Sequence, residues 1–165
     1  MFKLDKIKDM TDEERLKYML VLAKGQLSSE QDELANISNV TGIIMACVDK
    51  LNWAGFYFLR GGELVLGPFQ GLPACNRIAI GKGVCGTAVA TREVQLIPDV
   101  HQFPGHIACD AASNSELVIP IIKDDKVYGV LDLDSPVKNR FTELEKDYFV
   151  QLVDILNKNI NWDNI

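Results

Sequence analysis

The sequence predicts an α+β domain built around a mainly antiparallel sheet. Three observations lead to this prediction: helical periodicities at both ends of the chain, two β-hairpin patterns, and an irregular glycine-rich stretch between the hairpins. Adjacent hairpins indicate antiparallel pairing, and helices at the two ends would cover one face of the sheet. The 165 residues contain no repeat and no Pro/Ser-rich linker, so we expect one domain spanning residues 1–165.

Two helices are predicted near the N-terminus. Thr11 and Glu14 have the spacing of a capping box, which opens a helix with a regular apolar face. Ser29 with Asp32 is expected to start a second helix that runs to about Lys50. The apolar positions of this second helix keep a helical period, and they are Leu34, Ile37, Ile44, Val48 and Leu51.

A further helix is predicted at the C-terminal end of the chain. Thr142 and Glu145 repeat the capping-box spacing. The apolar positions expected to form its buried face are Leu144, Tyr148, Leu152, Ile155 and Leu156.

Two hairpins are predicted between these helices. Trp53–Arg60 and Glu63–Phe69 flank a Gly-Gly pair, which suits the positive φ of a tight hairpin turn. Glu116–Ile122 and Val127–Leu133 are apolar runs joined by four charged residues, and they indicate a second hairpin.

The stretch between the hairpins is irregular. Arg77–Ile80 and Val94–Ile97 are expected to be short strands, and the small residues of Cys85–Thr91 to form one or two helical turns. Residues 98–115 are expected to be a long loop, and loops of this length inside compact domains are often functional.

Composition excludes several classes of protein. The chain has 17 Lys and Arg against 23 Asp and Glu, whereas a general nucleic-acid binder would present a basic face. No apolar run is long enough for a membrane span or, at the N-terminus, for a signal peptide. We therefore expect a cytoplasmic protein, and disulfides are rare in that compartment unless they are transient or catalytic. Of the four cysteines, Cys47 keeps a helical spacing with apolar neighbours and is expected to be a buried core residue.

The other three cysteines lie in the irregular stretch, and three interpretations of them remain open. In the first, Cys75, Cys85 and Cys109 are unrelated buried thiols. In the second, they bind a metal ion together with His101 or His106, and in the third they are partners in thiol redox chemistry. No two of them form the close pair that is typical of zinc sites, so the metal interpretation is disfavoured. Their shared position beside glycines favours the redox interpretation modestly.

Three acidic residues near these cysteines are interpreted either as a carboxylate cluster or as a solvated hairpin end. Strand alternation puts Asp132 and Asp134 on one face, and Glu116 would join them across the second hairpin. Crowded carboxylates raise one another's pKa, so one of them can act as a general acid, and the cluster attracts a cation such as an ammonium group. Trp53 and Tyr57 are interpreted either as core residues or as an aromatic box around a methyl group or cation.

Four segments together resemble one known family. They are NWAGFY at residues 52–57, LVLGPFQGLPACNRIAIGKGVCGTAVAT at 64–91, DVHQFPGHIACDAASNSELVIPI at 99–121 and GVLDLDSP at 129–136. These segments closely resemble the free methionine-(R)-sulfoxide reductases, which are stand-alone GAF-domain enzymes. The resemblance covers nearly the whole chain, and the PGHIACDA segment is specific to that family.

The resemblance implies a GAF fold, with N- and C-terminal helices on one face of the sheet and a loop-covered pocket on the other. It implies reduction of free L-methionine-(R)-sulfoxide to methionine, with thioredoxin as the electron donor, no metal or organic cofactor, and a homodimer. The alternative is a GAF module that binds a small ligand or senses redox state, but such modules usually accompany an output domain.

Site residues are also implied by the resemblance. Cys109 matches the nucleophile, Cys75 matches the resolving cysteine that forms a disulfide with it, and Cys85 is a second candidate for recycling. The remaining matches surround the substrate. The resemblance implies three carboxylates near the substrate's ammonium and sulfoxide oxygen, namely Glu116, Asp132 and Asp134. It also implies an aromatic wall against the substrate's methyl group, Trp53, and a second aromatic in the same cavity, Tyr57. Glu116 and Asp132 are the candidates for the catalytic proton donor.

Overall fold

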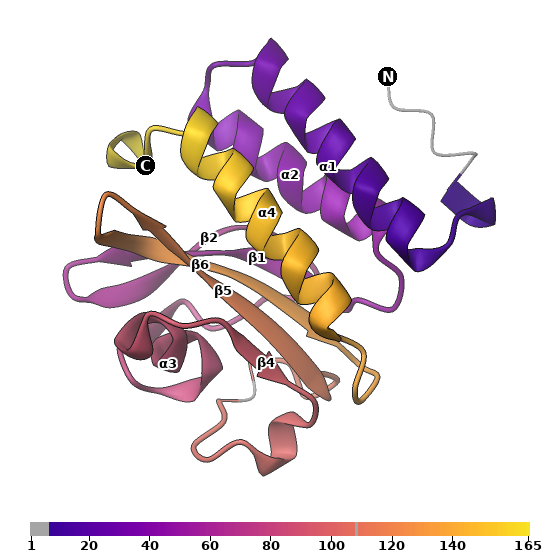
Figure 1. The fold of residues 1–165 in the computed structure, drawn as a ribbon. Coiled ribbons are helices and arrows are strands. Elements are labelled where there is room, and N and C mark those ends of the chain that lie inside the picture. Colours follow the sequence, from indigo (N-terminus) through magenta and orange to yellow (C-terminus); the bar gives the residue numbers. More distant parts are fainter. Residues whose placement is uncertain (1–6, 108) are drawn as a thin grey trace.

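The computed structural model describes residues 7–107 and 109–165 (Figure 1). Its α-helices are α1 (Asp12–Ser29), α2 (Glu33–Cys47), α3 (Gly83–Thr91) and α4 (Glu143–Asn159). Its strands are β1 (Trp53–Arg60), β2 (Glu63–Gln70), β3 (Arg77–Ala79), β4 (Gln95–Ile97), β5 (Ser115–Lys123) and β6 (Lys126–Ser135). Short 3-10 helices lie at Ile7–Asp9, Val100–Gln102 and Trp162–Asn164.

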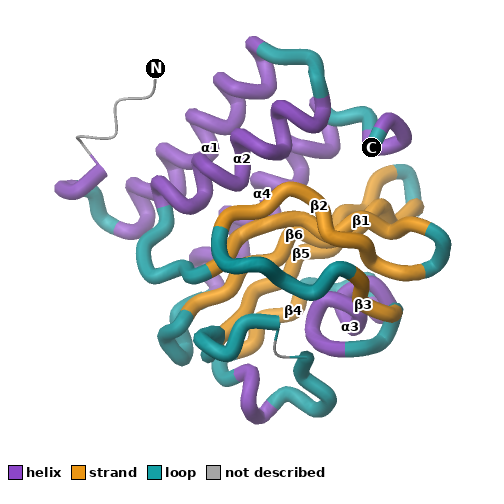
Figure 2. Tube along the Cα trace, turned by 180° about the vertical axis from the view of Figure 1, so that it is seen from behind, coloured by secondary structure: helices purple, strands orange, loops and turns teal. Residues whose placement is uncertain are grey.

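The strands form one antiparallel sheet in the order β3-β2-β1-β6-β5-β4. Helices α1, α2 and α4 cover one face of this sheet (Figure 1), and the view from behind shows α3 on the opposite face (Figure 2). This architecture confirms the predicted α+β fold class and the predicted placement of the terminal helices.

Both predicted capping boxes are present. The Thr11 side chain accepts the N–H of Glu14 while the Glu14 carboxylate accepts the N–H of Thr11, and this pair opens α1. Thr142 and Glu145 make the same reciprocal arrangement at the start of α4.

The predicted bounds of α2 were wrong at both ends. Ser29 belongs to the last turn of α1, where its hydroxyl donates to a carbonyl of the same helix, and Asp32 alone caps α2 by accepting the N–H of Ala35. The helix ends at Cys47 rather than near Lys50, because Lys50 has a φ of 61°, which a right-handed helix cannot continue.

The predicted buried face of α4 was also partly wrong. Leu144 is 37% exposed, whereas Phe149, which the prediction omitted, is fully buried. The core-facing apolar residues of α4 have the i, i+3, i+4, i+7 spacing of one helix face, and they are Phe149, Leu152, Val153 and Leu156.

Strand alternation divides the interior into two layers. In β1, Ala54, Phe56 and Phe58 pack with the helices α1, α2 and α4, whereas Trp53 and Tyr57 lie in a second cluster with α3. Phe56 is therefore a core residue, and the two other aromatics are free to line a pocket.

The second hairpin is longer than predicted. Asp124 and Asp125 both have positive φ and form a two-residue turn, so Lys123 and Lys126 pair across the strands instead of lying in the loop. Among its described residues, the predicted loop at 98–115 contains the 3-10 turn Val100–Gln102 and is otherwise irregular up to the start of β5 at Ser115.

Within residues 7–107 and 109–165, no helix combines the length and apolar character that crossing a membrane requires. Residues 1–6, part of the segment in which no signal peptide was expected, lie outside the described residues.

Candidate active site

A pocket lies on the α3 side of the sheet and has an empty volume of about 470 Å³, including its open mouth. Segments far apart in the sequence contribute to it: β1, the first turn of α3, the loop before β5, and the β5–β6 hairpin. Seven of the eight predicted site residues line this pocket, namely Trp53, Tyr57, Cys85, Cys109, Glu116, Asp132 and Asp134. The eighth, Cys75, is bonded to one of them.

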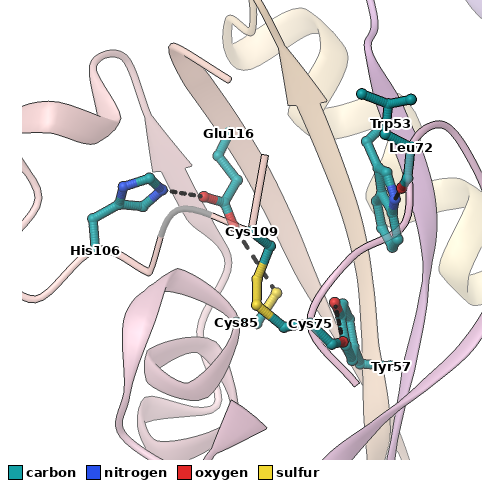
Figure 3. Close-up of a disulfide and its surroundings, with 8 residues drawn as sticks. All are labelled: Trp53, Tyr57, Leu72, Cys75, Cys85, His106, Cys109 and Glu116. Carbon is teal, nitrogen blue, oxygen red and sulfur yellow. Dashed lines mark hydrogen bonds and ion pairs between the residues drawn. A yellow bond between two sulfur atoms is a disulfide. The ribbon is translucent and has the colours of Figure 1, made fainter. Parts of the chain in front are cut away.

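Cys75 and Cys109 form a disulfide at the pocket, with their Cα atoms 5.4 Å apart (Figure 3). Cys75 lies in the loop between β2 and β3, and Cys109 lies in the loop before β5. The structure therefore contains the disulfide that the resemblance implied, and this bond joins two loops across the mouth of the pocket.

The two pocket aromatics hold the loop that carries Cys75. The Tyr57 hydroxyl donates to the Cys75 carbonyl at 2.9 Å, and the Trp53 indole N–H donates to the Leu72 carbonyl at 3.2 Å. Both polar groups are buried with a partner, while the rings stack with centroids 5.9 Å apart. Each aromatic thus lines the pocket and also fixes the position of the cysteine loop.

Asn52 holds the loop that carries Cys109. Its amide Nδ2 donates to the Asp110 carboxylate at 2.9 Å and to the Ser113 hydroxyl at 3.0 Å. Because Asn52 directly precedes β1, these bonds tie the loop to the start of a central strand of the sheet. Sequence reasoning did not assign a role to Asn52, and its only signal was its place beside Trp53 in a recognisable motif.

The three predicted carboxyl groups converge. Glu116 lies opposite Asp134 in the β5–β6 ladder, and Asp132 lies two residues away on the same face. Burial raises the pKa of Glu116 and of Asp134 well above the ordinary range, and the neighbouring carboxylates raise both further. Burial also raises the pKa of Asp132, to about 6. The cluster therefore retains protons near neutral pH.

Cys85 is a buried free thiol beside this cluster. Its Sγ donates to Glu116 Oε1 at 3.9 Å, as drawn in Figure 3. Burial first, and then the negative charges of Asp132 and Glu116, raise the thiol pKa well above its ordinary value. Cys85 is thus a protonated thiol near neutral pH.

Cys47 lies in the other layer, as predicted. It is fully buried, and burial raises its pKa to about 11. This thiol is far too basic to ionise near neutral pH, which suits a packing residue.

His106 is a second site residue that sequence reasoning missed, since it was considered only as a metal ligand. Its Nε2 lies 3.8 Å from Glu116 Oε2 (Figure 3). Burial, and then the charge of His101, lower the pKa of His106, so the ring is mainly neutral. Among the described lining residues, His106 is the one basic side chain, so the pocket favours a cationic ligand group.

One group of potential metal ligands occurs at the pocket. Ligand atoms of Cys85, Glu116 and Asp132 lie within 4.8 Å of one another, and all three residues are buried. Neither histidine belongs to this group among the described residues, so it is not the Cys/His arrangement considered from the sequence.

Comparison with known proteins identifies the family. The GAF domain model matches residues 36–160. A free methionine-R-sulfoxide reductase of Escherichia coli is 52% identical over 132 residues, covering 80% of this chain and 80% of the relative. The chain belongs to the free methionine-R-sulfoxide reductase family. Both the family resemblance and the GAF fold expected from the motifs are thereby confirmed.

Solved structures of free methionine-R-sulfoxide reductases have the same fold. The fRMsr of Staphylococcus aureus, in complex with substrate, has a TM-score of 0.84 and 47% identity, covering 88% of this chain and 95% of that chain. The reductase of Neisseria meningitidis, also in complex with its substrate, has a TM-score of 0.88 and 36% identity, covering 91% and 90%. These are oxidoreductases, and this chain is a member of the same enzyme family.

Proposed function

We propose that this chain reduces free L-methionine-(R)-sulfoxide to L-methionine, with Cys109 as the nucleophile. One observation carries the proposal: a Cys75–Cys109 disulfide opens on the same pocket as Glu116, a buried carboxyl group whose pKa is raised well above its usual value. A sulfoxide oxygen leaves only when it is protonated, so a reactive thiol and an acid must meet at one site. The names of the E. coli relative and of the substrate-bound neighbours support the same reaction.

The first step transfers oxygen from substrate to enzyme. The Cys109 thiolate attacks the sulfoxide sulfur, and Glu116 gives its proton to the oxygen as the S–O bond breaks. The hydroxyl so released bonds to Cys109 Sγ while the transient bond between Cys109 Sγ and the substrate sulfur breaks. Methionine leaves with the electron pair of that bond, and Cys109 becomes a sulfenic acid. Glu116 is preferred as the donor because its pKa is strongly raised by burial and its carboxyl points toward Cys85 and Cys109 in Figure 3.

The second step regenerates the thiols. The Cys75 thiol attacks the sulfenic sulfur of Cys109, water leaves, and the disulfide forms. An external dithiol, which we propose to be thioredoxin, then takes over the disulfide and releases both cysteines as thiols. Cys85 remains outside this cycle, because it is buried, protonated and unbonded while the other two cysteines are paired.

The rest of the pocket matches a free amino acid. Asp132, with a pKa near 6, supplies negative charge for the substrate ammonium, and Asp134 lies beside it on the same face of β6. Trp53 and Tyr57 form an apolar wall for the methyl group. The first turn of α3 lines the pocket, and its N-cap Lys82 makes no side-chain cap, so backbone N–H groups remain for the substrate carboxylate.

The same proposal includes the cytoplasmic location and the single domain over residues 1–165 that the sequence predicts, and the homodimer that the family resemblance implies. Sedimentation of the purified protein checks the dimer.

A stereochemical assay tests the reaction. The protein is incubated with free methionine-R-sulfoxide or with the S epimer, using thioredoxin or dithiothreitol as reductant, and methionine is quantified. We expect turnover of the R epimer alone, and none with a Cys109→Ser variant. Absence of turnover with the R epimer would refute the proposed reaction, and equal turnover of both epimers would refute its stereochemistry.

A further inference from the structure

Cys85 is a buried nucleophilic atom that the proposed reaction does not use. It lies at the floor of the pocket with one carboxyl on each neighbouring strand, Glu116 on β5 and Asp132 on β6. A thiolate and two carboxylates are together a donor set for borderline-soft divalent cations, whereas magnesium and calcium prefer oxygen alone. We infer that Cys85, Glu116 and Asp132 form a binding site for a zinc-type divalent cation, separate in function from the reductase reaction.

The spacing of the three donor atoms fits such an ion. Zinc bonds of about 2.3 Å to sulfur and about 2.0–2.2 Å to oxygen, at a tetrahedral angle, put the two ligand atoms about 3.5 Å apart. The distance from Cys85 Sγ to Glu116 Oε1 is 3.9 Å, and all three donor atoms lie within 4.8 Å of one another.

Asp132 provides an independent indication of a missing partner. The side chain is 6% exposed, and its Oδ1 atom is buried without a hydrogen-bond partner among the described residues. A buried acceptor without a partner is costly, at about 1–3 kcal/mol for a typical polar group. Asp132 lines the same pocket wall as Glu116, so a cation held between the two would satisfy this atom.

The charges around the three ligands also favour a cation. Asp134 lies on the same sheet face, and no Lys or Arg is found among the described lining residues. His106, at 3.8 Å from Glu116 Oε2, is placed to orient that carboxylate, in the manner of outer partners of metal ligands. On binding, the Cys85 thiol and any protonated carboxyl release their protons to solvent, and no electron is transferred.

Three protein ligands leave a fourth position open, as in zinc sites that keep a water molecule. The bound ion would lie inside the pocket and exclude an ammonium group from the same carboxylates. Zinc-type ions are therefore expected to compete with any cationic ligand of the pocket. This inference concerns metal binding itself, so it holds or fails independently of the reductase proposal.

Cobalt(II) titration tests the site directly, because this ion replaces zinc and absorbs light in a thiolate-dependent way. The probe is added to the protein with its Cys75–Cys109 disulfide intact, which leaves Cys85 and Cys47 as the free thiols. We expect saturable binding with a thiolate-to-cobalt charge-transfer band, reversed by added zinc. Cys85→Ser should weaken binding about 100-fold or more, since even outer partners of metal ligands contribute 10–100-fold.

The matched control is Cys47→Ala, which removes the other free thiol from the opposite layer and should leave the spectrum unchanged. Asp132→Asn keeps the thiol but removes a ligand charge, and it should also weaken cobalt binding while the circular dichroism spectrum is retained. No saturable binding by the wild-type protein, or equal affinity in Cys85→Ser, would overturn the inference.

Discussion

Glu116 combines the two properties that a proton donor at this pocket needs. It is 6% exposed and keeps its proton near neutral pH, and its carboxyl is aimed at the sulfur atoms. Burial raises the pKa of Asp134 as well, but its side chain is hydrogen-bonded to Ser113. Position rather than acidity therefore separates the two groups.

Replacing Glu116 by Gln is expected to lower kcat for the sulfoxide about 10²–10⁴-fold, the usual contribution of a positioned acid. The substrate KM should change less, because Asp132 and Asp134 remain. A pH–rate profile checks the prediction, since the descending limb due to loss of the proton should disappear. The exposed Glu93→Gln is the control, and a Glu116→Gln enzyme with wild-type kcat would assign the proton to another group.

The two candidate recycling cysteines differ in what they contact. Cys75 is bonded to Cys109, whereas Cys85 is bonded to neither and donates to Glu116. We expect Cys75→Ser to release one equivalent of methionine in a burst and then to recycle poorly with thioredoxin. Cys85→Ser should cycle through the remaining pair. Rapid quench with product counting distinguishes the two, and full thioredoxin-dependent cycling by Cys75→Ser would give the resolving role to Cys85.

At the scale of elements, the β2–β3 loop depends on a glycine beside an aromatic ring. Gly71 has a φ of 134°, and a Cβ added there would lie 2.6 Å from Trp53 Cδ1 and 2.7 Å from the Asn52 carbonyl oxygen. Any side chain would therefore strain the backbone and clash with the indole of Trp53.

Gly71→Ala is expected to lower the melting temperature and to raise the substrate KM, because both the Trp53 wall and the loop that carries Cys75 would shift. Gly25→Ala is the matched control, since an added Cβ in this turn of α1 meets nothing within 4 Å. It should instead stabilise the protein by up to about 1 kcal/mol through helix propensity. Thermal unfolding and steady-state kinetics measure both effects, and equal behaviour of the two variants would contradict the packing argument.

Element boundaries were predictable where local chemistry decides them. The capping boxes at Thr11 and Thr142 and the glycine turn after β1 are short-range devices, and each was predicted correctly. The start of α2 was mispredicted because Ser29 and Asp32 are both good caps, and only the preceding helix shows which one is free.

At the scale of the whole molecule, the pocket links folding to pH. Burial raises the pKa of Asp132 to about 6 and raises those of Glu116 and Asp134 further above their usual values. An unfolded chain ionises its carboxyls near pH 4, so above that pH the folded state binds more protons than the unfolded state. The free energy of unfolding therefore falls as the pH rises from about 4 through the raised pKa values of these groups.

Asp134→Asn is expected to gain stability relative to wild type as the pH rises from 5 to 8, because the variant has no buried proton to lose. Each 1 kcal/mol corresponds to about 2–4 °C in melting temperature for a protein of this size. Thermal unfolding across this pH range measures the difference between the two proteins. The exposed Glu93→Gln should give a flat difference, and a flat result for Asp134→Asn would show that its folded-state pKa is ordinary.

The sequence by itself determined the fold class, the alternation that turns Asp132 and Asp134 to one face, and the membership of the reductase family. These depend on local periodicity and on contiguous motifs, which are legible along the chain. Tertiary structure decided which groups meet: Cys75 with Cys109, Cys85 with Glu116, and Asn52 with the Cys109 loop. It also decided which groups are buried away from water, because burial depends on packing between distant segments. Protonation follows burial, so the chemical state of the carboxyls and of the Cys85 thiol is a property of the folded molecule.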